Sequence, residues 1–397
     1  MRFTGVKSIG IRGPIIREGD NLKDIVINTL LSAANNEKIE LHDKDVIAIT
    51  ESIVARAYGN YATVDQIAKE IKDKYKSGTI GLIHPIMSRN RFAILLKAIA
   101  RGAKKIVLMF SYPSDEVGNS FLSYDEIDEK NVNPYNDVFN LTQFRETFGY
   151  KKHEFTGVDY IEYFKELIES ENCECEIIFA NNVKTILNYT KDILTCDIHA
   201  RKRTKKILKE NGANIVYGLD DILNSSIDGS GFNEKYGLLG SNKATEEKVK
   251  LFPNDTCVQL VYDIQKELKE KTGKTLEVMV YGDGAFKDPQ GKIWELADPV
   301  VSPAHTDGLV GTPNELKLKY LADNDYKNLS GDELKNAIKD SIQKKSKDLK
   351  GNMASEGTTP RQITDLLGSL ADLTSGSGDK GTPFVLIQGY FDNYADE

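Results

Sequence analysis

The chain has 397 residues, a formal net charge of −8 and 40 % hydrophobic residues, an ordinary composition for a folded globular protein. This length predicts two or three domains, each with a core of its own. The acidic balance argues against a nucleic-acid binder, and no run of about 18 apolar residues predicts a membrane span. The start has no signal-peptide pattern and the four cysteines form no disulfide framework, so we expect a cytoplasmic protein.

Short apolar runs alternate with amphipathic stretches along the chain, which predicts an α/β fold. The predicted strands are Asp45–Thr50, Thr79–Ile83, Lys105–Phe110, Glu176–Ala180, Asn214–Tyr217, Leu276–Tyr281 and Phe384–Gln388. The predicted helices are Leu22–Ala34, Val64–Tyr75, Arg89–Arg101, Tyr160–Ser170, Ala200–Asn211, Val258–Lys271, Asp332–Lys347 and Pro360–Leu373.

Asp159–Leu223 has the pattern of a small α/β unit, in which helices and strands alternate. Asn224–Gly231 is polar and rich in glycine, which indicates an insertion that rejoins the main body. A second polar stretch, Ala322–Thr359, is expected to cover one edge of the fold.

The first candidate for chemistry is the loop Gly13–Asp20, followed by a helix and by a strand that ends in Thr50-Glu51-Ser52. Small polar residues after a buried strand lie where α/β folds bind ligands. Backbone N–H groups at the start of the next helix favour an anion, and Arg56 would add a phosphate contact. A plain strand, turn and helix with a surface arginine explains the same residues.

The second candidate is Asp283, which follows a predicted apolar strand and lies between Gly282 and Gly284. Asp288, Glu295 and Asp298 come soon after. Carboxylates at a strand end are the oxygen ligands that Mg²⁺ or Mn²⁺ needs to hold phosphates. An ordinary Asp-Gly turn is the alternative.

The third candidate is the glycine-rich segment Ser375–Gly381, between a predicted helix and a predicted strand. Its backbone N–H groups are suited to cradle a phosphate. The segment does not match the P-loop pattern G-x-x-x-x-G-K-[ST], and a flexible connection explains it equally.

Three further patterns carry less weight. Cys173, Cys175, Cys196 and His199 invite a zinc site, but C-x-C is not a usual zinc spacing. Cys257 with His305 suggests a thiol nucleophile without a supporting motif. The basic run Arg201–Lys206 is most simply explained as a solvated helix face.

The amino-acid sequences of several segments, and their order along the chain, resemble the coenzyme F-420 gamma-glutamyl ligase family. They cover roughly residues 6–101, 235–300 and the last forty or so. The segments that carry the resemblance are PIIREGD, DKDVIAITESIVARAYGN, YGLLGSNKATEE, LFPNDTCVQLVYDIQKELKEKTGKTLEVMVYGDGAFK and GSGDKGTPFVLIQG. Family members attach L-glutamate to a phospho-lactyl flavin-like acid, using GTP and a divalent metal.

The resemblance implies a gamma-glutamyl ligase-like core of α/β class with α+β character. Residues 1–101 and 235–397 would form this core, residues 102–234 an inserted small α/β unit, and a second insertion would lie near residues 310–358. The family also implies a homodimer.

Carried over position by position, the resemblance makes Asp283 a metal ligand and assigns catalytic roles to Asp283 and Arg56. It implies nucleotide contacts at Gly13, Pro14, Ile15, Ile16, Glu51, Arg56, Asn242, Gly376, Ser377, Gly378, Asp379 and Gly381. Asp288 is a further candidate metal ligand.

Four positions depart from the family. Leu239 stands where the family has a metal-binding Asp, and Gly284 where it has a Thr. Arg56 replaces a Lys and Glu51 replaces a Ser. We therefore expect an acceptor acid other than the F-420 precursor.

The leading hypothesis is a ligase, dependent on GTP or ATP and on Mg²⁺ or Mn²⁺, that joins an amino acid such as L-glutamate to a cofactor-like small-molecule acid through an acyl phosphate. The alternatives are a catalytically inactive paralogue that binds or senses nucleotides, and a paralogue that binds none.

Overall fold

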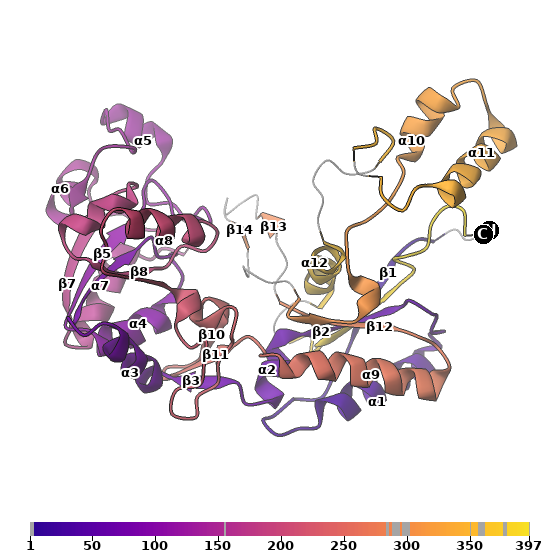
Figure 1. The fold of residues 1–397 in the computed structure, drawn as a ribbon, viewed down its shortest axis with the longest axis horizontal. Helices are drawn as coiled ribbons and strands as arrows, with labels where there is room; N and C mark the ends of the chain where they lie inside the picture. The colour runs from indigo at the N-terminus through magenta and orange to yellow at the C-terminus, as the bar shows by residue number, and fades with distance from the viewer. Residues whose placement is uncertain are drawn as a thin grey trace.

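The structure is a computed structural model that describes residues 4–154, 156–282, 286–287, 294–295, 302–349, 351–355, 362–375 and 379–396. The chain forms two lobes, a six-stranded one on the left of Figure 1 and a five-stranded one on the right, with a three-stranded sheet between them. Chain order shows that the six-stranded lobe is inserted between two parts of the five-stranded lobe.

The five-stranded sheet has the order β1-β16-β2-β12-β15, in which only β2 and β12 pair in parallel. Its strands are β1 (Lys7–Ile11), β16 (Phe384–Gln388), β2 (Val46–Thr50), β12 (Glu277–Tyr281) and β15 (Ala304–His305). Helices α1 (Leu22–Glu37) and α9 (Thr256–Thr272) pack on one face, and α12 (Ile363–Ser375) packs on the other. The central strands are therefore buried on both faces, so their sequences are continuously apolar.

The six-stranded sheet has the order β6-β7-β5-β4-β8-β9, and only β6 is antiparallel. Its strands are β6 (Phe139–Asn140), β7 (Glu174–Phe179), β5 (Lys105–Phe110), β4 (Thr79–Ile83), β8 (Asp192–Thr195) and β9 (Ile215–Gly218). Helices α3 (Val64–Lys74), α4 (Phe92–Gly102) and α7 (Tyr160–Ser170) share a core with one face. The 3₁₀-helix η1 (Val183–Asn188) and helix α8 (Arg201–Glu210) pack on the opposite face.

The three-stranded sheet joins β10 (Ser241–Thr245), β11 (Lys248–Leu251) and β3 (Tyr61–Thr63), all antiparallel. It lies between the two lobes in Figure 1, next to α2 (Glu51–Ala57). This sheet brings the chain segments that enter and leave the six-stranded lobe together.

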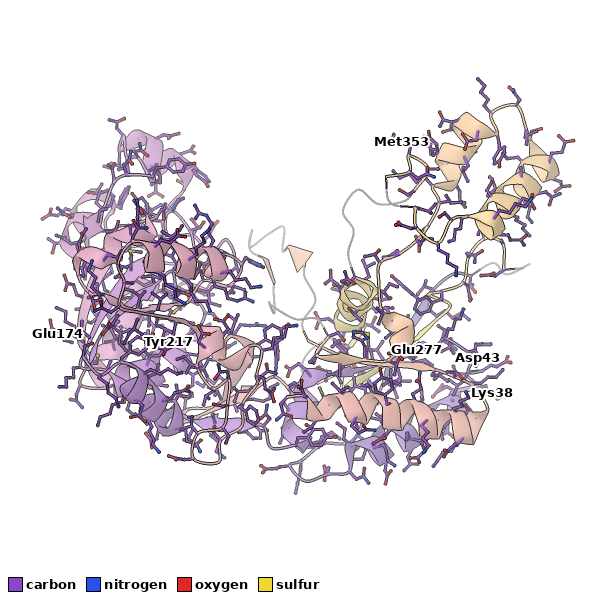
Figure 2. All side chains as sticks on the ribbon, viewed as in Figure 1. Lys38, Asp43, Glu174, Tyr217, Glu277 and Met353 are labelled. Atoms are coloured by element: carbon purple, nitrogen blue, oxygen red, sulfur yellow. The ribbon has the colours of Figure 1, made fainter. Side chains whose placement is uncertain are left out.

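The remaining elements are short or peripheral. They are α5 (Tyr124–Glu129), α6 (Leu141–Phe148), η2 (Leu219–Asp221), η3 (Gly237–Gly240), β13 (Phe286–Lys287), β14 (Trp294–Glu295), η4 (Asp307–Leu309), α10 (Leu318–Tyr320), η5 (Leu321–Asp325) and α11 (Gly331–Lys344). Helices α10 and α11 form an arm that projects from the five-stranded lobe, and Met353 lies beside this arm with 74 % of its surface exposed (Figures 1 and 2). Among the described helices, none is both long enough and apolar enough to span a bilayer.

The mixed content of helices and sheets confirms the predicted α/β class. Strands β4, β5 and β16 and helix α7 begin and end as predicted from the sequence. The predicted division between residues 101 and 102 separates β4 from β5, although these two strands pair in one sheet. A strand's apolar pattern indicates that it is buried but not which sheet it joins, which is why this division did not follow the sheet.

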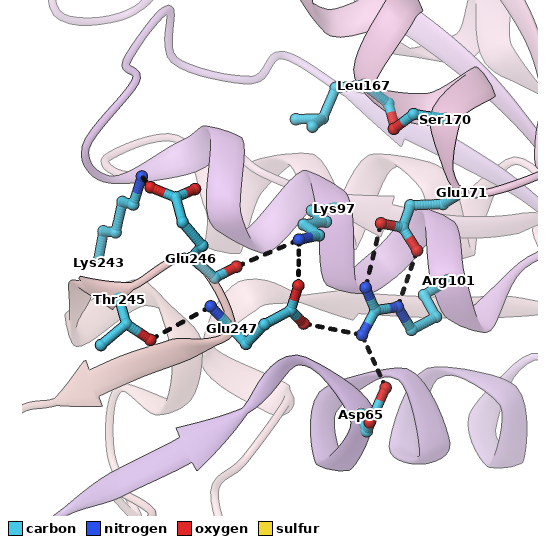
Figure 3. Close-up of polar contacts among 10 residues, drawn as sticks. All are labelled: Asp65, Lys97, Arg101, Leu167, Ser170, Glu171, Lys243, Thr245, Glu246 and Glu247. Atoms are coloured by element: carbon cyan, nitrogen blue, oxygen red, sulfur yellow. Dashed lines mark hydrogen bonds and ion pairs between the residues drawn. The ribbon is translucent and has the colours of Figure 1, made fainter.

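Arg101 connects several elements of the six-stranded lobe (Figure 3). Its guanidinium binds Glu171 at the end of α7 through two bonds of 2.8 and 3.1 Å, Asp65 on α3 at 2.8 Å, and Glu247 at 2.9 Å. The hydrogen bonds that Arg101 donates to these carboxylates, first of all to Glu171, raise its pKa well above the ordinary value. Glu247 lies in the turn between β10 and β11, so Arg101 fastens this hairpin to α3, α4 and α7.

We expect Arg101→Ala to lower the free energy of unfolding by about 2 kcal/mol, because it removes a two-bond ion pair and leaves Glu171 partly buried without its partner. Urea unfolding followed by circular dichroism would measure the change. Lys76→Ala is the matched control, because Lys76 pairs with Asp73 at a site where the two side chains are 75 % and 61 % exposed. The control should stay within about 0.5 kcal/mol of the parent chain. Equal effects of the two substitutions would contradict a structural role for Arg101.

Candidate functional site

Segments far apart in the sequence meet at one end of the five-stranded sheet. The N–H of Gly13 donates to the carbonyl of Gly381 at 3.0 Å, and the N–H of Thr50 donates to the carbonyl of Pro383 at 3.1 Å. Tyr281, the last residue of β12, lies opposite Thr50 in the parallel register. The structure thus brings the loop before α1, the ends of β2 and β12, and the loop before β16 together, as ligand sites in α/β proteins require.

Close packing fixes the glycine-containing loops at this end of the sheet. A Cβ atom on Gly13 would lie 2.8 Å from Phe384 and from Pro383, so a larger residue would force the two loops apart. The hydroxyl of Thr382 donates to the carbonyl of Ser375 at 2.6 Å, which joins the two ends of the predicted glycine-rich segment. Gly381 has a φ of +64°, a conformation that favours glycine.

Glu51 is buried at the start of α2, with 4 % of its surface exposed. The ammonium of Lys250 lies 3.2 Å from its Oε1, whereas its Oε2 has no hydrogen-bond partner among the described residues. Burial raises the pKa of the neighbouring Tyr281 to about 12, so this phenol is neutral at physiological pH. Glu51 therefore offers a buried acceptor beside a neutral hydroxyl.

A strongly basic pocket opens next to Glu51, between α2 and the three-stranded sheet. Its lining comes from the five-stranded lobe and the three-stranded sheet: Arg17, Glu18, Ser52, Arg56, Tyr61, Lys243, Ala244, Thr245, Lys248 and Lys250. Five of these side chains are cationic and one is acidic. Like charges that lie close together repel each other and destabilise a fold unless opposite charges offset them. Because the pocket has only one acidic side chain of its own, it is suited to bind an anion that carries several negative charges.

The strand pairing explains how the lysines reach the pocket. Lys250 lies opposite both Asn242 on β10 and Tyr61 on β3, and Lys248 lies opposite Thr63. Val249 is fully buried, so the lysines on either side of it face away from the core. The alternation Lys-Val-Lys-Leu over residues 248–251 is the sequence signal that the motif analysis missed.

The predicted nucleotide-binding residues have different surroundings. Arg56 lines the basic pocket, and Asn242 lies on β10 opposite Lys250. Pro14, Ile15 and Asp379 are exposed, whereas Ile16 is 3 % exposed and packs in the core with α1 and α9. The Ile16 side chain thus has a packing role. Gly376, Ser377 and Gly378 lie outside the described residues.

The two predicted metal ligands, Asp283 and Asp288, lie outside the described residues as well. Within the described part of the chain, no group of three or more His, Cys, Asp or Glu side chains is placed to hold a metal ion. Leu239, at the position of a family carboxylate, packs in the core of the six-stranded lobe with 9 % of its surface exposed.

The cysteine-based alternatives find no support. Cys173, Cys175, Cys196 and Cys257 are all free thiols, and they form no metal cluster in the described chain. Burial raises the pKa of Cys257 to about 12, so this thiol is protonated at neutral pH and is a poor nucleophile.

One family model, described as F420-0:Gamma-glutamyl ligase, matches residues 10–389 of the chain. The match spans both lobes and includes every residue that lines the basic pocket. No curated protein matches the chain.

The buried pair of Glu51 and Lys250 generates a prediction. Lys250→Met should destabilise the protein by about 3 kcal/mol, because it leaves the Glu51 carboxylate buried without a counter-charge. Adding Glu51→Gln to this variant should restore more than half of the loss. Urea unfolding of the two variants measures both effects, with Lys202→Met on the exposed face of α8 as control. A Lys250→Met variant as stable as its parent would show that the pair is not a buried ionic contact.

Proposed function

Because the family match spans nearly the whole chain, the protein belongs to the F420-0:gamma-glutamyl ligase family, and we propose that it is a nucleotide-dependent carboxylate–amine ligase. The observation that carries the proposal is the basic pocket at the end of β2. The donor would be GTP or ATP, with Mg²⁺ or Mn²⁺. The acceptor would be a cofactor-like small-molecule acid, and the incoming amine that of L-glutamate or another amino acid.

The charge of the pocket supports a phosphorylated substrate. The whole chain has a net charge of −8, yet five cationic side chains line this one pocket. Two of them are partly neutralised inside the protein, Lys250 by Glu51 and Lys243 by Glu246. Arg17, Arg56 and Lys248 have no ion pair with a described residue, so their charges are available to a ligand.

The proposed reaction needs two steps. A carboxylate oxygen of the acceptor attacks the terminal phosphorus of the nucleotide, which forms an acyl phosphate and releases the nucleoside diphosphate. The amino nitrogen of glutamate then attacks the acyl carbon, the C–O bond to phosphate breaks, and the nitrogen loses a proton as the amide forms. Arg56 and Lys248 would neutralise phosphate charge, and the loops at Gly13 and Gly381 would orient the reactants. Asp283 and Asp288 would hold the divalent cation, which screens the phosphates.

A second candidate function is nucleotide binding or sensing without catalysis. The observation that favours it is Leu239, which packs in an apolar core where the resembling family has a carboxylate. Loss of one metal ligand weakens a site that relies on two metal ions. If the protein binds or senses nucleotides without catalysis, the six-stranded lobe would serve as the surface that a partner binds. The expected homodimer and the cytoplasmic location stay predictions.

Phosphate release separates the two functions. The ligase should release inorganic phosphate from GTP or ATP only when a cofactor-like acceptor acid and an amino acid such as glutamate are both present. Asp283→Asn should abolish this turnover while the thermal midpoint of the protein stays unchanged. Undiminished turnover in that variant would overturn the role of Asp283, and nucleotide binding without any release would favour the sensing function.

The role of Arg56 is tested by binding. Arg56→Gln should weaken nucleotide binding by about tenfold, because one charge-assisted contact to phosphate is lost. Isothermal titration with GTP and ATP measures the dissociation constant, and Arg203→Gln on the exposed face of α8 serves as the matched control. Equal affinities of the Arg56 variant and the control would place the nucleotide elsewhere.

A further inference from the structure

Two helices on one face of the six-stranded sheet carry a group of exposed cations. The 3₁₀-helix η1 follows β7 and helix α8 follows β8, and the two helices contact each other above a shared apolar core. Because β7 and β8 both run parallel to β4 and β5, η1 and α8 return across the sheet side by side. The exposed cations of this region, which together we call the α8 face, are Lys184, Lys191, Lys202, Arg203, Lys206 and Lys209.

Few acidic side chains neutralise the α8 face. Among the residues that the structure describes, only Lys206 of the six cations has an ion pair, with Glu210 at 3.8 Å. The nearby acidic side chains are already bound to other cations. These pairs join Asp220 and Asp221 to Lys205, and Glu174 and Glu176 to Lys105. The charges of the α8 face are therefore available to a partner.

Helix α8 carries these charges at a cost to its own stability. Arg201, Lys202 and Arg203 form its first turn, where the helix dipole disfavours cations, and no acidic residue lies in that turn. Lys202 and Lys206 are four residues apart, so their like charges repel across the exposed surface. The exposed sides of α3 and α9, by contrast, mix acidic and basic residues. Charges that oppose the stability of their own helix are typical of functional surfaces, so a solvated helix face does not explain this run.

The size of the α8 face points to a short acidic segment as its partner. Lys202, Lys206 and Lys209 follow one stripe of the helix, which spans about 10 Å at a rise of about 1.5 Å per residue. A nucleic acid or a bilayer extends far beyond such a stripe and would meet a chain whose net charge is −8. Tyr189, two residues before Lys191, is 39 % exposed, and tyrosine is enriched in protein–protein interfaces.

We propose that the α8 face is a docking surface for an acidic segment of a partner protein. The carboxylates of that segment pair with the lysines of α8, and its apolar groups contact Tyr189. Complementary charge of this kind speeds association and makes it depend strongly on salt. No residue of the α8 face lines the basic pocket, so the docking is independent of the proposed ligase reaction.

The test measures the binding of a fluorescent peptide, in which glutamate and serine alternate, to the full chain by fluorescence anisotropy. The variant that combines Lys202→Gln, Lys206→Gln and Lys209→Gln should bind the peptide at least about tenfold more weakly, because three ion pairs are lost. Its thermal midpoint should stay close to that of the parent chain, because exposed substitutions change stability little. Peptide binding that this variant leaves unchanged would overturn the proposal. A clear loss of stability would show that the lysines support the fold, and would overturn it as well.

The matched control combines Lys72→Gln, Lys266→Gln and Lys269→Gln, which remove the same charge at exposed sites of α3 and α9. Its affinity for the peptide should stay within about twofold of the parent chain. Equal losses in the two triple variants would show that only the net charge of the chain matters, and the proposal would be wrong. It would also be wrong if a single-stranded oligonucleotide of equal charge, or vesicles with anionic lipid, bound more tightly than the peptide and lost this binding in the α8 variant.

Discussion

The pairing of β3 with β11 is the constraint on which the rest of the structure depends. The chain leaves the five-stranded lobe through β3 and returns through β11, and the two strands pair from Tyr61 to Thr63. Asn60 holds the segment that leaves the five-stranded lobe next to the segment that returns to it. Its side chain donates to the carbonyls of Phe232 and Phe252 at 3.1 and 2.6 Å and accepts the N–H of Phe232 at 3.0 Å. With 5 % of its surface exposed, Asn60 gains most of its hydrogen-bonding capacity from protein groups.

This crossing also creates the candidate site. Arg17 and Arg56 come from the five-stranded lobe, whereas Lys243, Lys248 and Lys250 come from the hairpin that Arg101 and Lys97 fasten to the six-stranded lobe. Neither lobe alone assembles the five cations. The inserted lobe therefore holds the hairpin that completes the site, and a substrate bound there would contact the five-stranded lobe and this hairpin.

Sequence reasoning succeeded where a segment's own residues determine its structure. Long apolar or amphipathic runs such as β5, β12, α7 and α9 were predicted within a few residues. Strand β1 and the strands of the three-stranded sheet were missed, because they are short and partly polar and gain stability only from their partners. Arg56 was recognised because it follows a strand that ends in small polar residues, whereas the lysines of β10 and β11 were not, since their convergence depends on strand pairing. The contact of Gly13 with Gly381 likewise depends on tertiary packing.

In the proposed function, the pocket between the five-stranded lobe and the hairpin binds a nucleotide together with a divalent cation. The most direct test is the thermal midpoint of the full chain with GTP, ATP or GDP, each combined with Mg²⁺, Mn²⁺ or a chelator. A ligand present at 100 times its dissociation constant stabilises a protein by about 2.7 kcal/mol, which is a shift of several degrees. The account predicts such a shift for one nucleoside triphosphate, dependent on the metal and reduced by Arg56→Gln. No shift with any combination would contradict it.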